Sequence, residues 1–179
     1  MANILNSIEL SLMSLKDFES KALAYDVFSA IADAGPQFFP TVYDVYEPLS
    51  HKCNKNDVDE LVRVWVNEEN ASVTSQNRYG MGQILMEHRR KPKISYQMHW
   101  EKGQQERFNY FIMSADSEFL MEENNFQTFL SLCMKLSVLL DPVQGEIVNC
   151  AFPGWDTPIN LQVRHPELHW MAFFGKPYI

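Results

Sequence analysis

Carboxylate side chains are concentrated in two short stretches of the chain. The first stretch carries Asp57, Asp59, Glu60, Glu68 and Glu69, and the second carries Asp116, Glu118, Glu122 and Glu123. An acidic surface attracts a basic partner, speeds their association and adds specificity. It also mimics a phosphate backbone, and so suits a protein that blocks the cleft of a nuclease. Carboxylates at helix starts are favoured by the helix dipole as well. Both groups are therefore candidate partner-binding surfaces, with the ordinary helix-start explanation left open.

Side chains that could catalyse a reaction are few and poorly grouped. His99 and Glu101 would share one face of a strand and could form an acid–base pair, although two solvated neighbours are the simpler explanation. His165 and His169 have the spacing of two metal ligands on a helix, but Pro166 lies between them. The sequence contains no GxSxG elbow and no HExxH pair. We therefore expect no catalytic residue, no metal and no cofactor.

The glycines and cysteines also lack the spacing of a chemical motif. Gly80-Met81-Gly82 lacks the third glycine of a dinucleotide fingerprint and the lysine of a phosphate loop, so it predicts a turn. Cys53, Cys133 and Cys150 are an odd number of distant cysteines without a CxxC pair. Their expected role is that of small buried hydrophobic residues, with a catalytic thiol as the alternative.

The net charge argues against nucleic acid as a partner. The chain carries a formal charge of −8 and has a pI of about 5.1, whereas phosphate neutralisation requires a basic surface. One basic run occurs, Arg89, Arg90, Lys91 and Lys93 around Pro92, and it predicts a solvated turn between two strands, with contact to an acidic protein partner or to phosphate as the alternatives. A basic protein partner suits this charge better, although many proteins are acidic merely for solubility.

Length and composition predict one domain over residues 1–179. The chain has 179 residues, of which 46% are hydrophobic, enough for an ordinary core. No apolar run reaches the roughly 20 residues of a membrane helix. Residues 1–14 alternate polar and apolar side chains, which is unlike a signal peptide. We therefore expect a cytoplasmic protein without a membrane partner.

The first half of the chain predicts a strand, a helix, a strand and a second helix. Residues 8–12 alternate with a period of two. A capping-box-like pair predicts a helix that begins at Ser14 and stops at Gly35-Pro36. A strand is expected over 37–46, then a loop, and then a helix capped by Asn56 or Asp57. That second helix is strongly amphipathic, with apolar side chains at Val58, Leu61, Val62 and Trp65.

The second half predicts an antiparallel meander followed by a helix. Strands are expected over 83–88, 94–101 and from Phe108, with Phe108, Tyr110 and Ile112 continuing the apolar period. A hairpin loop is expected at 102–105. A third helix should run from 125 to 140, with Phe126, Phe129, Leu130, Cys133, Met134 and Leu140 on one face. A strand and aromatic-rich loops follow, so the predicted class is α+β, a largely antiparallel sheet packed against about three helices.

The C-terminal segment is the most individual part of the sequence. It contains Gly154-Trp155, Pro166-Glu167-Leu168-His169-Trp170 and Phe173-Phe174-Gly175-Lys176-Pro177-Tyr178-Ile179. This pattern resembles the C-terminal signature of immunity protein family 52, from bacterial polymorphic toxin and type VI secretion loci, over roughly the last quarter of the chain. The signature positions are Trp155, Trp170, Phe174, Gly175 and Tyr178. They are expected either to pack the end of the chain against the sheet or to contact the partner. Gly175 is expected to supply a backbone conformation that other residues cannot adopt.

The resemblance implies an α+β protein that binds and inactivates a co-encoded toxin, often one with a restriction-endonuclease-like nuclease domain. It implies no catalytic residues. We therefore expect stoichiometric inhibition of a cognate effector, with a homodimer left open. Two alternatives remain: an adaptor for an unrelated protein, or an enzyme that reverses or degrades a toxin product. The enzyme would draw on His99, Glu101, His165 or Cys133.

Overall fold

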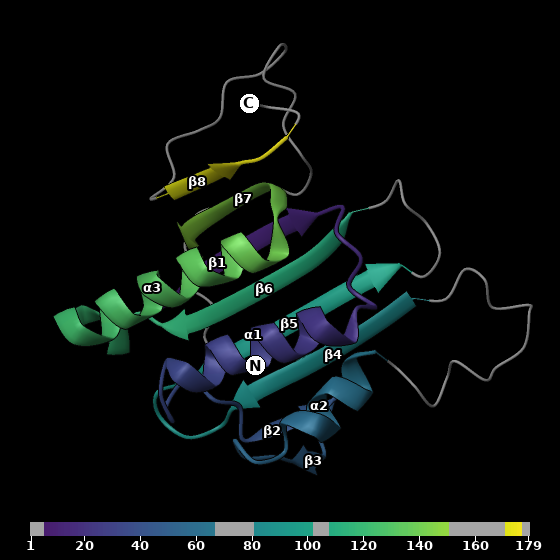
Figure 1. Ribbon diagram of the computed structural model, residues 1–179. Helices are drawn as coiled ribbons and strands as arrows, with labels where there is room; N and C mark the ends of the chain where they lie inside the picture. Colours follow the sequence, from purple (N-terminus) through teal and green to yellow (C-terminus); the bar gives the residue numbers. More distant parts are fainter. Residues whose placement is uncertain (1–5, 67–80, 102–107, 151–170, 177–179) are drawn as a thin grey trace, which may run out of the picture.

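The computed structural model describes residues 6–66, 81–101, 108–150 and 171–176 (Figure 1). Its strands are β1 (Ser7–Ser14), β2 (Val42–Asp44), β3 (His51–Lys52), β4 (Met81–His88), β5 (Ile94–Glu101), β6 (Asn109–Asp116), β7 (Pro142–Asn149) and β8 (Met171–Phe174). Its helices are α1 (Lys21–Asp33), α2 (Val58–Trp65) and α3 (Glu123–Leu140), with a 3-10 turn η3 (Phe119–Met121).

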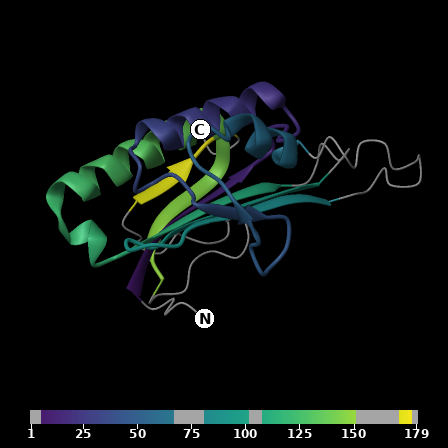
Figure 2. The ribbon, with the colours of Figure 1, turned by 90° about the horizontal axis from the view of Figure 1, so that it is seen from below.

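The eight strands form one sheet in the order β3-β2-β4-β5-β6-β1-β7-β8. Every neighbouring pair is antiparallel. The three α-helices lie along the same side of the sheet (Figure 2), and none of the described helices covers the opposite side, here called the helix-free face. The predicted α+β class is confirmed.

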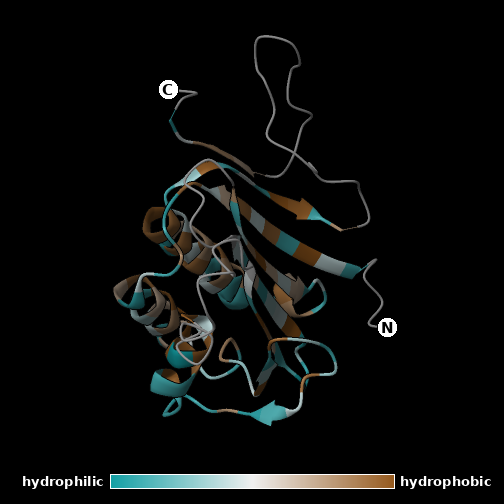
Figure 3. Cartoon of the chain, turned by 90° about the vertical axis from the view of Figure 1, so that its right-hand side faces the viewer, coloured by the Kyte–Doolittle hydropathy of each residue, from teal (hydrophilic) through white to brown (hydrophobic). Residues whose placement is uncertain are grey.

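The core lies between the sheet and the helices. Hydrophilic and hydrophobic residues alternate along several strands (Figure 3), so β1, β5 and β6 each turn one buried row toward the helices. Along β1 this row is Ile8, Leu10 and Leu12, all buried. From α2, Leu61 and Trp65 reach the same core. The predicted opening strand and the predicted second helix are therefore confirmed.

The expected start of the first helix was wrong. Ser14 is the last residue of β1, and its Oγ donates a hydrogen bond to the Leu140 carbonyl oxygen at 2.6 Å. α1 begins at Lys21 instead, because the Ser20 side chain accepts a hydrogen bond from the Leu23 N–H at 3.3 Å and caps the helix. The helix ends at Asp33, before the predicted glycine-proline stop.

The strand expected over 37–46 is shorter than predicted. Only Val42–Asp44 forms β2. Pro36 and Pro40 have no N–H to donate to a neighbouring strand, so the chain between them remains a loop even though Phe38 and Phe39 are buried.

The row of side chains predicted to be buried in the third meander strand was wrong by one residue. Phe111, Met113 and Ala115 of β6 are buried beneath the helices, whereas Tyr110 and Ile112 lie on the helix-free face. Both rows of this strand contain large apolar side chains, so alternation alone does not choose between them. The register does, since Phe111 pairs with Leu12 and Met113 with Leu10 of β1.

The third helix starts two residues before its expected start, and its buried face differs from the predicted one. Leu132 and Leu136 are buried, whereas Met134 is 49% exposed. Asp141, with φ 45°, ends the helix in the left-handed region. Within the described ranges, no helix combines the length and the apolar character needed to cross a membrane. The hairpin loop predicted at 102–105 lies outside the described residues.

Candidate functional site

A groove with a volume of about 590 Å³ lies on the helix-free face of the sheet. Outward-facing side chains of β1, β4, β5 and β6 form its floor, and the β2–β3 connection forms a wall with Glu47 and Leu49. It brings together side chains that lie far apart in the sequence, from Glu9 to Glu118. We name it the acidic groove, after the carboxylates described below.

One row of side chains crosses the floor of the acidic groove at right angles to the strands. The pairing registers join Glu87 of β4 to Ser95 of β5, Ser95 to Ser114 of β6, and Ser114 to Glu9 of β1. The two ends of the row are therefore acidic and its middle is formed by two small hydroxyl side chains. Along the strands, the next row contains Leu85, Gln97 and Ile112.

The groove has an excess of negative charge. Of the described residues that line it, five are carboxylates and one is a lysine. The carboxylates are Glu9, Glu47, Glu87, Asp116 and Glu118, and the lysine is Lys93. In the described part of the chain, no hydrogen bond or ion pair engages the carboxylates of Glu47, Glu87 and Glu118. The groove therefore presents negative charge that the described fold does not neutralise.

Glu9 is a partly buried carboxylate of the groove. Its burial raises its pKa, and the charge of the neighbouring Glu146 raises it further. The thiol of Cys150 donates to Glu9 Oε2 at 3.7 Å and favours the ionised form. A cation over Glu9 would reduce the cost of keeping this carboxylate charged.

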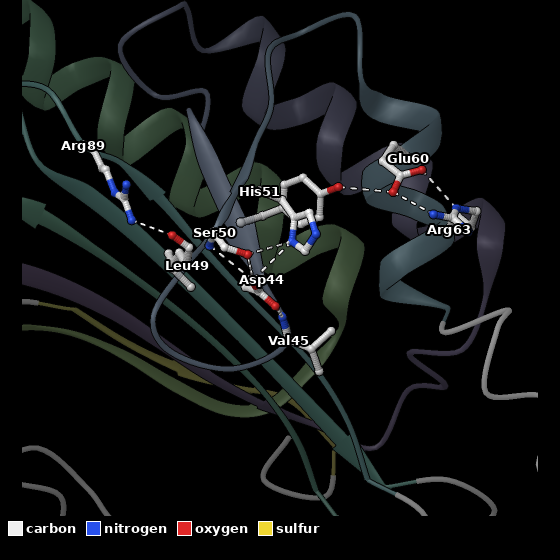
Figure 4. A network of polar contacts seen from close by, with 9 residues as sticks. Asp44, Val45, Leu49, Ser50, His51, Glu60, Arg63 and Arg89 are labelled. Atoms are coloured by element: carbon white, nitrogen blue, oxygen red, sulfur yellow. Dashed lines mark hydrogen bonds and ion pairs between the residues drawn. The ribbon is translucent and has the colours of Figure 1, made fainter.

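The wall of the groove is held in place by a network around Asp44 (Figure 4). The carboxylate of Asp44 accepts hydrogen bonds from Ser50 Oγ at 2.6 Å and from the Val45 and Ser50 N–H groups at 2.8 and 3.2 Å. Its Oδ2 also lies 3.1 Å from His51 Nδ1. Hydrogen bonding by Ser50, Val45 and the nearby His51 holds the pKa of Asp44 at about 2.

Two strand side chains fix the same wall from β4 and its following turn. Gln83 Nε2 donates to the Val45 carbonyl oxygen at 2.5 Å, and Arg89 Nη2 donates to the Leu49 carbonyl oxygen at 2.6 Å. Tyr46, which is 72% exposed, projects from this fixed segment. The wall is therefore held in one place by hydrogen bonds of the fold itself, and a preorganised surface loses less entropy on association than a mobile one.

The serine, histidine and aspartate of this network do not form a nucleophilic triad. The Ser50 hydroxyl donates to Asp44 Oδ2 at 2.6 Å, and its contact with His51 is longer, 3.4 Å, and made to Nδ1, the same ring nitrogen that faces Asp44. A carboxylate with a pKa of about 2 is also a weak base. In a triad the base accepts the serine proton and the carboxylate orients the base. The arrangement here fixes a loop.

The Asp44 network makes the wall acid-sensitive. Its folded pKa of about 2 lies below the ordinary value of 3.8, so its contribution to loop order is present above about pH 4 and is lost as the pH falls toward about 2. We expect protection factors of the Val45 and Ser50 amides, measured by hydrogen exchange, to fall in this window. Asp44→Asn should lower them at all pH values. A variant that kept the full acid-dependent loss would contradict this assignment.

The first predicted acidic group is engaged within the fold where it is described. Tyr25 Oη donates to Asp59, and the Asn54 N–H donates to Asp57 at 2.8 Å. Arg63 binds Glu60 through two nitrogen atoms, at 2.8 and 2.9 Å, and lowers the pKa of this carboxyl. Glu68 and Glu69 lie outside the described residues. These contacts favour a structural role for α2, and its role in partner binding stays a prediction.

The second predicted acidic group is divided between two places. Asp116 and Glu118 line the acidic groove. Glu122 and Glu123 lie at the start of α3. Glu122 accepts a hydrogen bond from Asn125 Nδ2 at 3.0 Å, and Glu123 accepts one from Gln127 Nε2 at 2.7 Å. The structure thus brings only the first two together with the acidic side chains of other strands.

The two described residues that were considered for catalysis, Cys133 and His99, lie on opposite sides of the sheet. Cys133 is fully buried, and burial raises its pKa far above the ordinary thiol value. Burial likewise raises the pKa of Cys53 to about 12. His99 faces the helix-free side of β5, next to Tyr110. The Glu101 side chain, His165 and His169 lie outside the description. No cluster of three metal-ligating side chains occurs among the described residues.

Two of the five signature positions are described. Phe174 pairs with Gln144 at the end of β8. A Cβ on Gly175 would lie 2.2 Å from the Pro142 carbonyl oxygen, so glycine is required by this close approach. The expected special backbone conformation was wrong, because Gly175 is not among the glycines with positive φ. Trp155, Trp170 and Tyr178 lie outside the described residues.

Sequence patterns did not point to Glu9, Glu47 and Glu87 as site residues, and they placed Lys93 in a basic run apart from the acidic groups. Glu9 and Glu87 occupy ordinary polar positions of alternating strands, which is the only local signal they carry. Their meeting depends on four strands pairing in one register. The acidic groove is therefore a product of long-range pairing.

Comparison with known proteins shows the fold. No protein-family model matches the chain, and no curated protein matches it. A solved structure of the Pseudomonas aeruginosa type VI secretion system (T6SS) protein PA0821 is similar, with a TM-score of 0.53 and 14% sequence identity. The match covers 88% of this chain and 48% of the PA0821 chain, so this chain spans about half the length of PA0821. Membership of immunity protein family 52 stays a prediction.

Proposed function

We propose that this protein is an immunity protein that neutralises a cognate effector in the cytoplasm by binding it with defined stoichiometry. The observation that carries the proposal is the acidic groove, whose carboxylates are left without cationic partners in the described fold. The fold similarity to a T6SS protein and the tail resembling an immunity family support the same reading. The binding surface is the helix-free face of the sheet.

The lining of the groove favours binding over catalysis. Among its described residues are carboxylates, hydroxyls, amides and apolar side chains, but no histidine and no cysteine. In their pairing row Ser95 and Ser114 neighbour each other and the carboxylates of Glu87 and Glu9, and no histidine lies among them. Such a surface recognises a partner through charge and shape, as protein interfaces do.

The charge of the groove suggests the class of effector. A nuclease attracts a polyanion into a basic cleft, so carboxylates that enter or cover this cleft compete with the nucleic acid. The net charge of −8 adds long-range attraction to a basic partner. Active-site occlusion is thus the simplest mechanism of neutralisation.

The test is co-expression of the chain with the protein encoded by the adjacent gene, followed by co-purification and a nuclease assay. We expect a stable complex and loss of nuclease activity near an equimolar ratio. Protection of cells without a complex would overturn stoichiometric binding in favour of an enzyme that removes a toxin product. Absence of both effects would overturn the immunity function itself.

A further inference from the structure

We propose that the acidic groove receives an extended segment of the effector that runs across the strands and places two basic side chains, about four residues apart, over Glu87 and Glu9. The inference rests on the proposed function, because it takes the occupant to be part of the effector. It adds the conformation of that segment and the spacing of its charges.

The spacing follows from the row that crosses the groove floor. Glu87 and Glu9 stand on β4 and β1, which are separated by β5 and β6. Neighbouring strands lie roughly 4.8 Å apart, so the two positions are about 14 Å apart. An extended chain advances roughly 3.3 Å per residue, so side chains four residues apart are separated by about 13 Å and point to the same side. The two distances agree.

The floor between the two glutamates favours a narrow occupant. Ser95 and Ser114 are small, so a chain can approach the sheet closely between the acidic ends of the row. Their hydroxyls can donate to carbonyl groups or accept from N–H groups of a visiting backbone. A helix, with a diameter of about 10 Å, would remain further from these hydroxyls. The small side chains therefore favour an extended segment.

The neighbouring row suits the stems of basic side chains. Leu85, Gln97 and Ile112 lie beside the serines along the strands and line the same groove. Lysine and arginine cover apolar surface with their methylene groups while the charged end stays near a carboxylate. The groove therefore combines an apolar support with two acidic end points, and its charge selects against an acidic segment.

The test uses synthetic peptides and does not require the effector. Capped peptides of serine and threonine carry two lysines spaced by two, four or eight residues, and binding is measured by calorimetry at low ionic strength. We expect the four-residue spacing to bind best, with chemical-shift changes at the Ser95 and Ser114 amides. A peptide with glutamates in place of the lysines should not bind. Equal binding of all spacings, or tighter binding of the polyamine spermidine, would overturn the proposal.

Two matched variants locate the binding. Glu87→Gln should weaken binding of the peptide with lysines four residues apart roughly two- to fivefold, as expected for an exposed ion pair. It should also abolish the preference for that spacing. Glu123→Gln makes the same change at the start of α3, outside the groove, and should have no effect. Equal weakening by both would overturn the groove as the site.

These results separate the inference from the proposed function. If the protein neutralises the effector but shows no spacing preference, the proposed function stands and the extended-segment mode of recognition is overturned. If the protein selects the peptide with lysines four residues apart but does not bind the effector, the proposed function is overturned. The extended-segment mode then describes recognition of a different partner protein.

Discussion

Replacing Glu87 and Asp116 together by lysine should abolish neutralisation of the effector. Each substitution turns an attractive charge in the groove into a repulsive one, and like charges across an interface cost several kcal/mol. Since about 1.4 kcal/mol corresponds to a factor of ten, we expect the affinity for the effector to fall roughly a hundredfold or more. Calorimetry or surface plasmon resonance with the purified effector measures this loss.

The matched control for this prediction is the double variant Glu122→Lys and Glu123→Lys. It changes the net charge by the same amount but at the start of α3, away from the groove. We expect it to retain most of the affinity, with a change confined to the association rate. An equal loss in both double variants would mean that net charge, or the α3 end, carries the interaction. Circular dichroism shows whether each variant is folded.

Trp65→Ala should be among the most destabilising single substitutions in the described core. Trp65 is fully buried, and its ring contacts Phe28 and Trp100 at centroid distances of 5.5 and 6.1 Å. Its Nε1 donates to the Phe18 carbonyl oxygen at 2.5 Å. Removing a buried tryptophan side chain costs about 3–5 kcal/mol, so the free energy of unfolding measured with urea should fall by that amount.

Two variants separate the contributions of Trp65. Trp65→Phe retains an aromatic ring but removes the N–H donor, and should cost less, about 1–3 kcal/mol. Tyr46→Ala removes an aromatic side chain that is 72% exposed and should change stability by no more than about 0.5 kcal/mol. A loss for Trp65→Ala no larger than that for Tyr46→Ala would contradict the packing described here.

Local patterns predicted elements well where one face of the element is apolar and the other polar. β1 and α2 are examples, since Leu10 and Leu61 belong to clear apolar rows that the helices and sheet bury. β6 is the opposite case, because Ile112 and Met113 are both apolar and only strand pairing decides which is buried. For α1, the sequence pattern predicted a start at Ser14, but this residue ends β1 and Ser20 caps the helix instead.

The site was predictable in its chemistry and not in its location. The acidic balance and the stretch containing Asp116 and Glu118 are visible in the sequence. Their assembly with Glu9 and Glu87 requires the antiparallel order β4-β5-β6-β1, which places the first strand beside three strands from the middle of the chain. Clustering along the sequence also selected Glu60, whose carboxylate binds Arg63 within the fold. Proximity in sequence is a weak guide where a sheet makes the site.

The central claim, that the acidic groove contacts the effector, is tested most directly by site-specific photo-cross-linking. A photoreactive phenylalanine derivative takes the place of Ser95 on the groove floor, and in a second protein it takes the place of Val138, which is 78% exposed on α3 at the helix side of the sheet. We expect irradiation of the complex to link the effector through position 95 and not through position 138. Cross-links from position 138 alone would contradict the account and place the effector on the helices.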